Sequence, residues 1–392
     1  MTLNDHKAML DGIRIVDMSS VVFGPYATQI LSDLGAEVIK VEPPGGDDYR
    51  QASAPAVTPK MAPEFMAINR NKKSVILDLK KPDDSALMRD LLKTADIFLH
   101  NIRAQAVERL GLGYQTVRGY NPEIIYVHCR GYGANGPYSD FPAYDDAVQA
   151  ASGATTLLPR VDGNPKPRFL PSLLADKTAG LHAAYTTLAA IIHKLRTGKG
   201  QAIEVSLFES FTSFILKEHL SGHAFEPKRG TIGYDRQINP DRQPFPTKDG
   251  YITIVPYRPE QWPVVFALLG DPDFFKHPDF ADMRGIRKNG FKLYQRLAEL
   301  TALQTTAALA EKLQGNDIPA QAAKDLNDVF DDPHLQAVGF FEKSQHPTEG
   351  TFYHIREAAK FSAWEVPACR PAPLLGEHTK DIHSMIHGRT NG

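Results

Sequence analysis

The sequence contains few of the residues that mark several common classes of protein. Its 392 residues include only two cysteines, Cys129 and Cys369. This number argues against a disulfide framework and against a cysteine-rich metal site. The formal net charge of -2 gives no sign of steering toward nucleic acid or an acidic membrane. No run of about 18 apolar residues occurs, and the polar start is unlike a signal peptide. We therefore expect a cytoplasmic protein that binds neither nucleic acid nor membranes.

Motifs for nucleotide, metal and serine chemistry are also scarce. Gly131–Gly136 matches G-x-G-x-x-G, but Pro137 and Pro142 follow it. No helix is predicted to begin there, as a dinucleotide site requires. The sequence has no P-loop and no G-x-S-x-G elbow. His219 and His223 are four residues apart on a predicted helix, but no third ligand is evident, so we expect a structural role and no metal site.

What is present is an alternation of strands and helices, in a composition (42 % hydrophobic, 23 % charged) typical of globular proteins. Strands separated by helices indicate a parallel sheet that is covered on both faces. The pattern predicts strands at 13–16, 37–41, 74–79, 97–99, 124–128 and 203–206. It predicts helices at 25–34, 85–94 and 178–195, with a further helix ending near residue 220.

A change in composition near Glu226 divides the chain. Residues 226–249 are rich in Pro, Arg, Asp and Asn and have little helical periodicity. We predict a large α/β domain over 1–225, a smaller α+β domain over 226–325, and a return segment over 326–392 that completes the large domain.

Asp176 lies between small and apolar residues, just before the predicted helix 178–195. One interpretation is a helix cap, because Asp accepts the free amide hydrogens of a first helical turn. The other is a nucleophile that the positive helix end keeps ionised, with room for a substrate beside it. The local sequence leaves both open.

Basic residues near the predicted strand ends give a hint of a phosphorylated ligand, because ligands of open α/β sheets bind there. These residues are Lys40, Arg70, Lys72, Lys73, Lys80, Arg103 and Arg109.

A series of short blocks then identifies a resemblance. The chain resembles the class III coenzyme A (CoA) transferase family, also called CaiB/BaiF, which contains formyl-CoA transferases and α-methylacyl-CoA racemases. The matching blocks are Leu10–Asp17, Asp33–Pro44, Asn71–Ser74, Leu77–Lys80, Arg109–Gly111, Gly131–Gly133, Ala175–Asp176, Thr197–Gln201, Asp332–His334 and Ala372–Thr379.

The resemblance implies a CoA-transferase in which Asp176 is the nucleophile. CoA or an acyl-CoA is then a substrate, a small organic acid is the partner substrate, and no cofactor is permanently bound. The CoA contacts that carry over are Val22, Phe23, Leu77, Lys80, Asn101, Ile102, Arg103, Arg109, Tyr144 and Asp145. Two basic positions of formyl-CoA transferases are Pro43 and Pro142 here. The family also implies an interlocked homodimer, with crossings expected at 226–249 and 326–345.

The reaction type depends on Tyr144. Racemases of the family have a histidine at this position, paired with the residue that matches Asp176. Tyrosine, with a pKa near ~10, is a poorer proton acceptor at neutral pH, which favours a transferase over a racemase. The family's glycine-rich loop is replaced by Asn239–Pro246, which argues against the formyl-CoA and oxalate substrate pair. We expect instead a dicarboxylic acid such as succinate, itaconate or mesaconate. It would be held by Arg236, Arg242 or Arg258. A non-catalytic CoA-binding protein is the remaining alternative.

Overall fold

The computed structural model describes residues 8–53 and 56–390, and the chain forms two compact units. The first contains residues up to Thr155, then Phe169–Lys217 and the residues from Leu335 onward. The second contains Thr156–Arg168 and Glu218–His334. The second unit is therefore larger than the predicted small domain, 226–325, because residues 156–168 and 218–225 also belong to it. Arg160 Nη1, for example, lies 3.5 Å from the carbonyl oxygen of Ile232.

The first unit is built on a six-stranded parallel sheet in the order β3-β2-β1-β4-β5-β6. Each strand pairs in parallel with its neighbour; Ile15, for example, lies between Val38 and Ile97. The predicted parallel sheet is confirmed. The strands are β1 (Arg14–Met18), β2 (Glu37–Glu42), β3 (Lys73–Ile76), β4 (Ile97–His100), β5 (Ile125–Arg130) and β6 (Gln201–Ser206).

Helices cover both faces of this sheet, which explains why its central strands are apolar on both sides. On one face, β-sheet residues such as Val16, Ile39 and Phe98 share a core with Leu91 and Val117. On the other face lie α1 and α8, which pack against each other and against the sheet. The helices of this unit are α1 (Phe23–Asp33), α2 (Pro63–Asn69), α3 (Pro82–Lys93), α4 (Ala104–Arg109), α5 (Tyr114–Tyr120), α6 (Asp145–Ala151), α8 (Leu174–Thr197) and α9 (Leu207–His219).

The chain returns to this unit after the second one. The antiparallel hairpin of β10 (Phe341–His346) and β11 (Gly350–Ile355) is followed by helix α15 (Thr379–Thr390). This helix packs on α3 and β3, and Ile382 and Ile386 join the core beneath the sheet.

The second unit combines a small antiparallel sheet with short helices. Strands β7 (Phe245–Pro246), β8 (Tyr251–Ile254) and β9 (Ala320–Ala322) form the sheet. A core of its own, including Trp262, Phe266 and Leu297, stabilises it. Its helices are α7 (Leu157–Asp162), α10 (Gln261–Leu268), α11 (Met283–Lys288), α12 (Gly290–Thr301) and α13 (Thr306–Gln314); α14 (Pro333–Ala337) lies where the chain leaves it. Among the helices of the described residues, none has the length and apolar character needed to cross a membrane.

Candidate active site

A cavity of about 350 Å³ lies beside the carboxyl ends of β1, β4 and β5. The turn after β1 (Ser20–Phe23), the loop after β4 (Asn101–Ala106) and Gly131 after β5 contribute to its wall. From β1 the sheet continues through β2 on one side and through β4 on the other. The cavity is therefore at a topological switch point, where open parallel sheets bind their ligands.

Asp176 lines this cavity from the first turn of α8 and is only 8 % exposed. The helix begins at Leu174, earlier than predicted, and its N-cap residue is Leu173. The prediction of Asp176 as a helix cap is therefore wrong, because Asp176 lies inside the helix. The carboxylate of Asp145, from the start of α6, takes the capping role instead: its Oδ2 accepts the backbone N–H of Asp176 at 2.9 Å.

The expectation that the helix end keeps Asp176 ionised is also corrected. Burial, followed by the charge of Asp145, raises the pKa of Asp176 from 3.8 to about 7. Desolvation disfavours the charged form, and a second carboxylate nearby adds to the effect. Such a carboxyl group exchanges a proton near neutral pH and is more basic than an ordinary aspartate, which is typical of functional sites.

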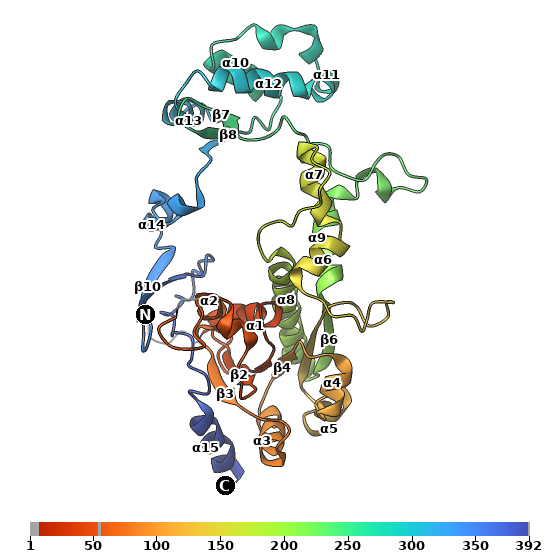
Figure 1. Ribbon diagram of the computed structural model, residues 1–392, viewed down its shortest axis with the longest axis vertical. Coiled ribbons are helices and arrows are strands. Elements are labelled where there is room, and N and C mark those ends of the chain that lie inside the picture. Colours follow the sequence, from red (N-terminus) through yellow and green to blue (C-terminus); the bar gives the residue numbers. More distant parts are fainter. Residues whose placement is uncertain (1–7, 54–55, 391–392) are drawn as a thin grey trace. The chain divides into compact units, whose positions relative to one another are not determined.

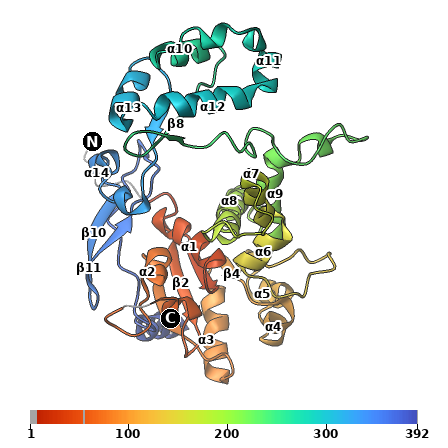
Figure 2. The same cartoon turned by 45° about the horizontal axis from the view of Figure 1, so that its top comes forward.

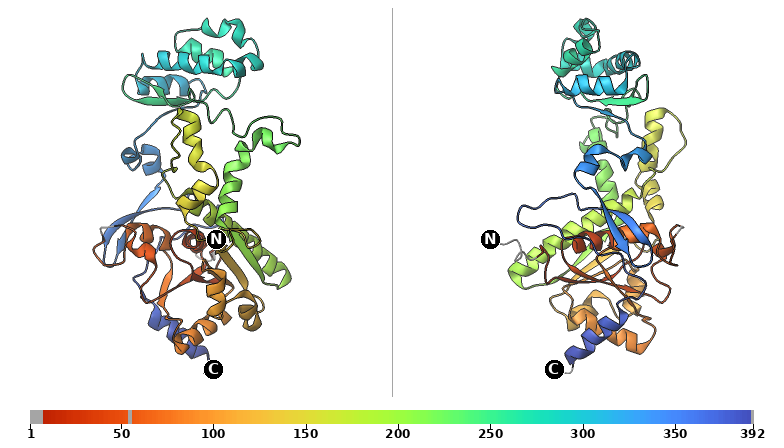
Figure 3. Two further views of the ribbon diagram at one scale, coloured as in Figure 1. Left: turned by 45° about the vertical axis from the view of Figure 1, so that its right-hand side comes forward. Right: turned by 90° about the vertical axis from the view of Figure 1, so that its left-hand side faces the viewer.

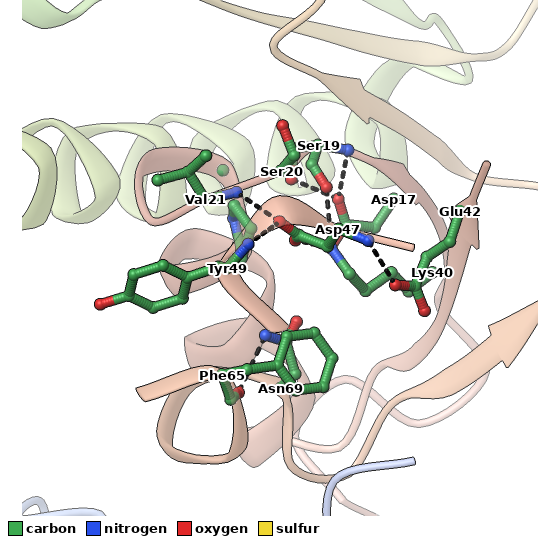
Figure 4. A network of polar contacts seen from close by, with 12 residues as sticks. Asp17, Ser19, Ser20, Val21, Lys40, Glu42, Asp47, Tyr49, Phe65 and Asn69 are labelled. Carbon is green, nitrogen blue, oxygen red and sulfur yellow. Dashed lines mark hydrogen bonds and ion pairs between the residues drawn. The ribbon is translucent and has the colours of Figure 1, made fainter. Parts of the chain in front are cut away.

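The turn after β1 contains a strained residue. Val21 has a φ of 66°, a conformation that β-branched residues rarely adopt. Asp47 Oδ1 accepts the N–H of Val21 and of Tyr49, each at 3.0 Å, and fixes the turn (Figure 4). Asp47 Oδ2 in turn lies 2.8 Å from Nζ of the fully buried Lys40. Strain of this kind persists where the surroundings hold it, and such sites are often functional.

Most of the basic residues that hinted at a phosphate are engaged in ion pairs. Besides Lys40, the buried Lys72 lies 3.3 Å from Asp17, and the buried Arg70 lies 2.5 Å from Asp33. Lys73 pairs with Glu37 at 2.6 Å. Charges taken out of water require such partners, so the structure does not offer these four side chains to a ligand.

Three other basic residues remain exposed, and they include two that line the cavity. Arg103 and Arg109 come from the loop after β4 and from α4. Lys80 lies with Leu77 in an adjacent cavity of about 360 Å³, and Ile102 contributes to both cavities. These positions offer guanidinium and ammonium groups suited to phosphate.

Two histidines that the sequence analysis did not select hold the loop between these cavities. The N–H of Ile102 donates to His100 Nδ1 at 3.2 Å, and the carbonyl of Ile102 lies 2.9 Å from His128 Nε2. The two rings stack at 4.4 Å. Asn101 adds two hydrogen bonds to the backbone of Ser20, at 2.8 and 3.0 Å. The sequence offers one signal for them: His100 directly follows the predicted strand 97–99, and His128 ends the next predicted strand, 124–128.

The remaining predicted contacts lie around the same cavity. Val22, Phe23 and Tyr144 contribute to its wall, and Tyr144 is 69 % exposed there. Asp145 is buried behind Asp176. The two positions that depart from formyl-CoA transferases, Pro43 and Pro142, line the adjacent cavity and this one respectively.

The glycine motif at 131–136 begins no helix. Carboxylates already occupy two of its amides: the N–H of Gly133 donates to Glu209 and that of Ala134 to Glu204, both at 2.9 Å. His219 and His223 do not share a helical face, because α9 ends at His219 and His223 lies in the 3-10 turn Ser221–Ala224.

The three arginines expected to bind an acid belong to the second unit. Arg236 lies over the ring of Tyr257 at 5.3 Å, and Arg258 lies 3.7 Å from Glu260. Arg242 donates to the side chain of Gln237 at 3.3 Å.

A buried, basic carboxyl group facing a cavity at the switch point of a parallel sheet is typical of an enzyme that works through a carboxylate. The model of CoA-transferase family III matches residues 10–379, and the chain belongs to this family. It is a class III CoA-transferase.

Relatives that align over nearly the whole chain support this family assignment. The probable fatty acyl-CoA transferase Rv3272 of Mycobacterium tuberculosis is 35 % identical over 94 % of this chain and 96 % of its own. The mouse succinyl-CoA:glutarate CoA-transferase is 33 % identical over 96 % of this chain and 86 % of its own. A crystal structure of Rv3272 superposes with a TM-score of 0.84 at 32 % identity, covering 96 % of this chain and 99 % of that one. A CaiB/BaiF family protein from Brucella suis superposes with a TM-score of 0.82 at 28 % identity, covering 97 % and 100 %.

Proposed function

We propose that this enzyme transfers CoA from an acyl-CoA to a small dicarboxylic acid, with Asp176 as the covalent nucleophile. The observation that supports this most directly is the position of Asp176. Its carboxyl group is buried, has a pKa of about 7, and lines the cavity to whose wall most of the other predicted CoA contacts contribute.

The reaction proceeds by four acyl transfers. The Asp176 carboxylate attacks the thioester carbonyl, the C–S bond breaks, and a mixed anhydride and CoA thiolate result. The thiolate attacks the aspartyl carbonyl and releases the donor acid as a carboxylate, leaving an aspartyl–CoA thioester. The acceptor carboxylate attacks that thioester, and the expelled thiolate attacks the acyl carbonyl of the new anhydride. The products are acyl-CoA and free Asp176, with no net gain or loss of protons.

The cavity supports these steps by positioning and by excluding water. A carboxylate is a weak nucleophile in water, but holding it against the thioester supplies an effective molarity of ~10⁵ M or more. The raised pKa increases its nucleophilicity. Arg103, Arg109 and Lys80 would bind the CoA phosphates, while Val22 and Phe23 would flank its acyl end.

The acceptor is inferred from the relatives and from the second unit. Relatives from mouse and from Agrobacterium fabrum are named for succinyl-CoA or succinate and for glutarate. We propose that Arg236, Arg242 or Arg258 grips the far carboxylate of such an acid. Each arginine is replaced by Ala in turn. For the arginine that binds the acid, the replacement should raise KM for the dicarboxylate about tenfold or more. If dicarboxylate turnover survives all three changes together, this assignment fails.

The proposed assembly is the interlocked homodimer of the family. Helix α8 exposes a row of apolar side chains at helical spacing, among them Leu181, Tyr185 and Ile192. A row of this kind is typical of a surface that another chain covers. Light scattering at micromolar concentration should give the mass of a dimer, and a monomer would contradict the proposal.

Trapping the intermediate tests the nucleophile. The protein is incubated with a panel of acyl-CoA thioesters and treated with hydroxylamine or borohydride, and the modified residue is mapped by mass spectrometry. Modification at Asp176, absent in Asp176→Asn, supports the transferase. Loss of α-hydrogen stereochemistry in D₂O without CoA transfer would instead indicate a racemase, and tight binding with neither reaction would indicate a CoA-binding protein.

A further inference from the structure

Behind Asp176 lies a buried glutamine that the mechanism above does not use. Gln149, on α6, is 1 % exposed and makes four polar contacts. Its Nε2 donates to Asp145 Oδ1 at 2.6 Å and lies 3.3 and 3.1 Å from the carbonyl oxygens of Leu170 and Ser172. Its Oε1 accepts the N–H of Leu170 at 2.8 Å.

These contacts join the two parts of the chain that set the place of Asp176. Residues 170–172 are the approach to α8, and Asp145 accepts the backbone N–H of Asp176. The carboxylate of Asp145 is thus held between Gln149 on one oxygen and Asp176 on the other. A buried amide with this many partners is costly to disturb, because each lost contact leaves a buried polar group unpaired.

We propose that Gln149 is a positioning residue for the transfer reaction: through Asp145 and residues 170–172 it orients the carboxylate of Asp176 toward the thioester. This inference rests on the proposed role of Asp176 as the nucleophile. It assigns a role to the Nε2 donor in particular, because two of the three acceptors of that donor are backbone carbonyls and the third is a carboxylate.

Replacing the donor by an acceptor isolates this role. Gln149→Glu keeps the length of the side chain and the acceptor for Leu170, but its second oxygen faces Asp145 Oδ1. When the new carboxyl is protonated, its O–H donates to Asp145 as the amide does. When it is ionised, two carboxylates face each other and the arrangement breaks, since one of two carboxyls sharing a site has a strongly raised pKa.

We expect Gln149→Glu to lose adduct-forming activity as pH rises, a dependence that a packing defect alone does not produce. The rate of adduct formation on Asp176 is measured in single turnover with an acyl-CoA, for the unchanged protein and for Gln149→Glu. The ratio of variant to unchanged rate should fall at least about tenfold between about pH 6 and about pH 9. KM for the acyl-CoA should change little, because the hydrogen-bond partners of the Gln149 side chain among the described residues (Asp145, Leu170 and Ser172) are not part of the cavity wall.

Taking the ratio removes the contribution of the other charged and titratable groups around Asp176, which both proteins share. These groups are Asp145 from α6, Asp48 and Tyr49 from the 3-10 turn Asp48–Gln51, Lys177 on α8, and Arg103, Arg109, His128, Arg130, Asp140 and Tyr144 of the cavity wall.

Gln29 provides a matched control. It is also a buried helical glutamine that donates to an aspartate four residues away, Asp33, but on α1 and outside the cavity wall. Gln29→Glu should lower stability by a similar amount and leave the rate ratio independent of pH.

Gln149→Met, which fills the volume without a donor, should lower the adduct rate about tenfold at every pH. A pH-independent ratio for Gln149→Glu, or an unchanged rate for Gln149→Met, would overturn the inference. If neither variant folds, by circular dichroism and thermal melting, Gln149 has a role in stability alone and the inference is also overturned. Failure of the proposed function looks different: the unchanged protein then forms no adduct at Asp176.

Discussion

Replacing Asp176 by Asn should stabilise the protein, and the gain should grow with pH. The pKa of Asp176 is about 7 in the folded protein, whereas an ordinary aspartate, as in the unfolded chain, has a pKa of 3.8. Between these values the folded protein binds the proton that the unfolded chain has released. Stability therefore falls as pH rises through this window, because the unfolded state loses its proton first.

The magnitude follows from the size of the shift. About three pKa units at ~1.4 kcal/mol each amount to about 4 kcal/mol of destabilisation when the pH exceeds the folded pKa. At about pH 5 the same group costs only about 1.5 kcal/mol. An uncharged asparagine avoids this cost, so its advantage should grow by about 2.5 kcal/mol between about pH 5 and about pH 8.

Urea unfolding of both proteins across this pH range measures the difference. Asp176→Asn should be inactive and more stable, a trade of stability for activity that is common in enzyme sites. An advantage that stays constant with pH, or that shrinks as pH rises, would refute the assignment of the raised pKa to Asp176.

Three further changes test other parts of the site. Asp47→Ala removes the ion-pair partner of the buried Lys40 and should cost about 3–5 kcal/mol in urea unfolding; a loss below about 1 kcal/mol would contradict the role given to Asp47. Arg109→Ala should raise KM for acyl-CoA about tenfold and leave the thermal midpoint unchanged, because the side chain is exposed; an unchanged KM would remove it from the phosphate contacts. Tyr144→His should introduce exchange of the α-hydrogen of an acyl-CoA with D₂O, detectable by mass spectrometry, because histidine accepts protons near neutral pH; no exchange would show that Tyr144 does not decide between transfer and racemisation.

The elements of the sheet could be predicted because each depends on local sequence. Buried parallel strands are short apolar runs, and helices of the expected period separate them. The start of α8 was misplaced because Leu173 and Leu174 carry no capping group, while the cap comes from Asp145 on another helix. A cap that comes from a distant part of the sequence cannot be recognised from the residues around the start of the helix.

The candidate site was partly predictable for a similar reason. The family resemblance selected Asp176 and the residues around its cavity, whose roles stay a prediction. The position of basic residues near predicted strand ends did not by itself separate Arg109, which lines the cavity, from Lys40 and Lys72, whose partners Asp47 and Asp17 lie on other segments. Nor could the resemblance find Gln149, because its partners at 170–172 are close to it only in the folded chain.

The return of the chain to the sheet has a consequence for biosynthesis. Gly376 and Ser74, 302 residues apart, are joined by a hydrogen bond, and Ile386 packs in the same core as Val75. Contacts between such distant residues form late in folding. During translation, the underside of β3 and α3 would stay uncovered until residues 376–390 leave the ribosome. A chain terminated before Gly376 would therefore expose apolar surface, and we expect it to depend on chaperones or to be degraded.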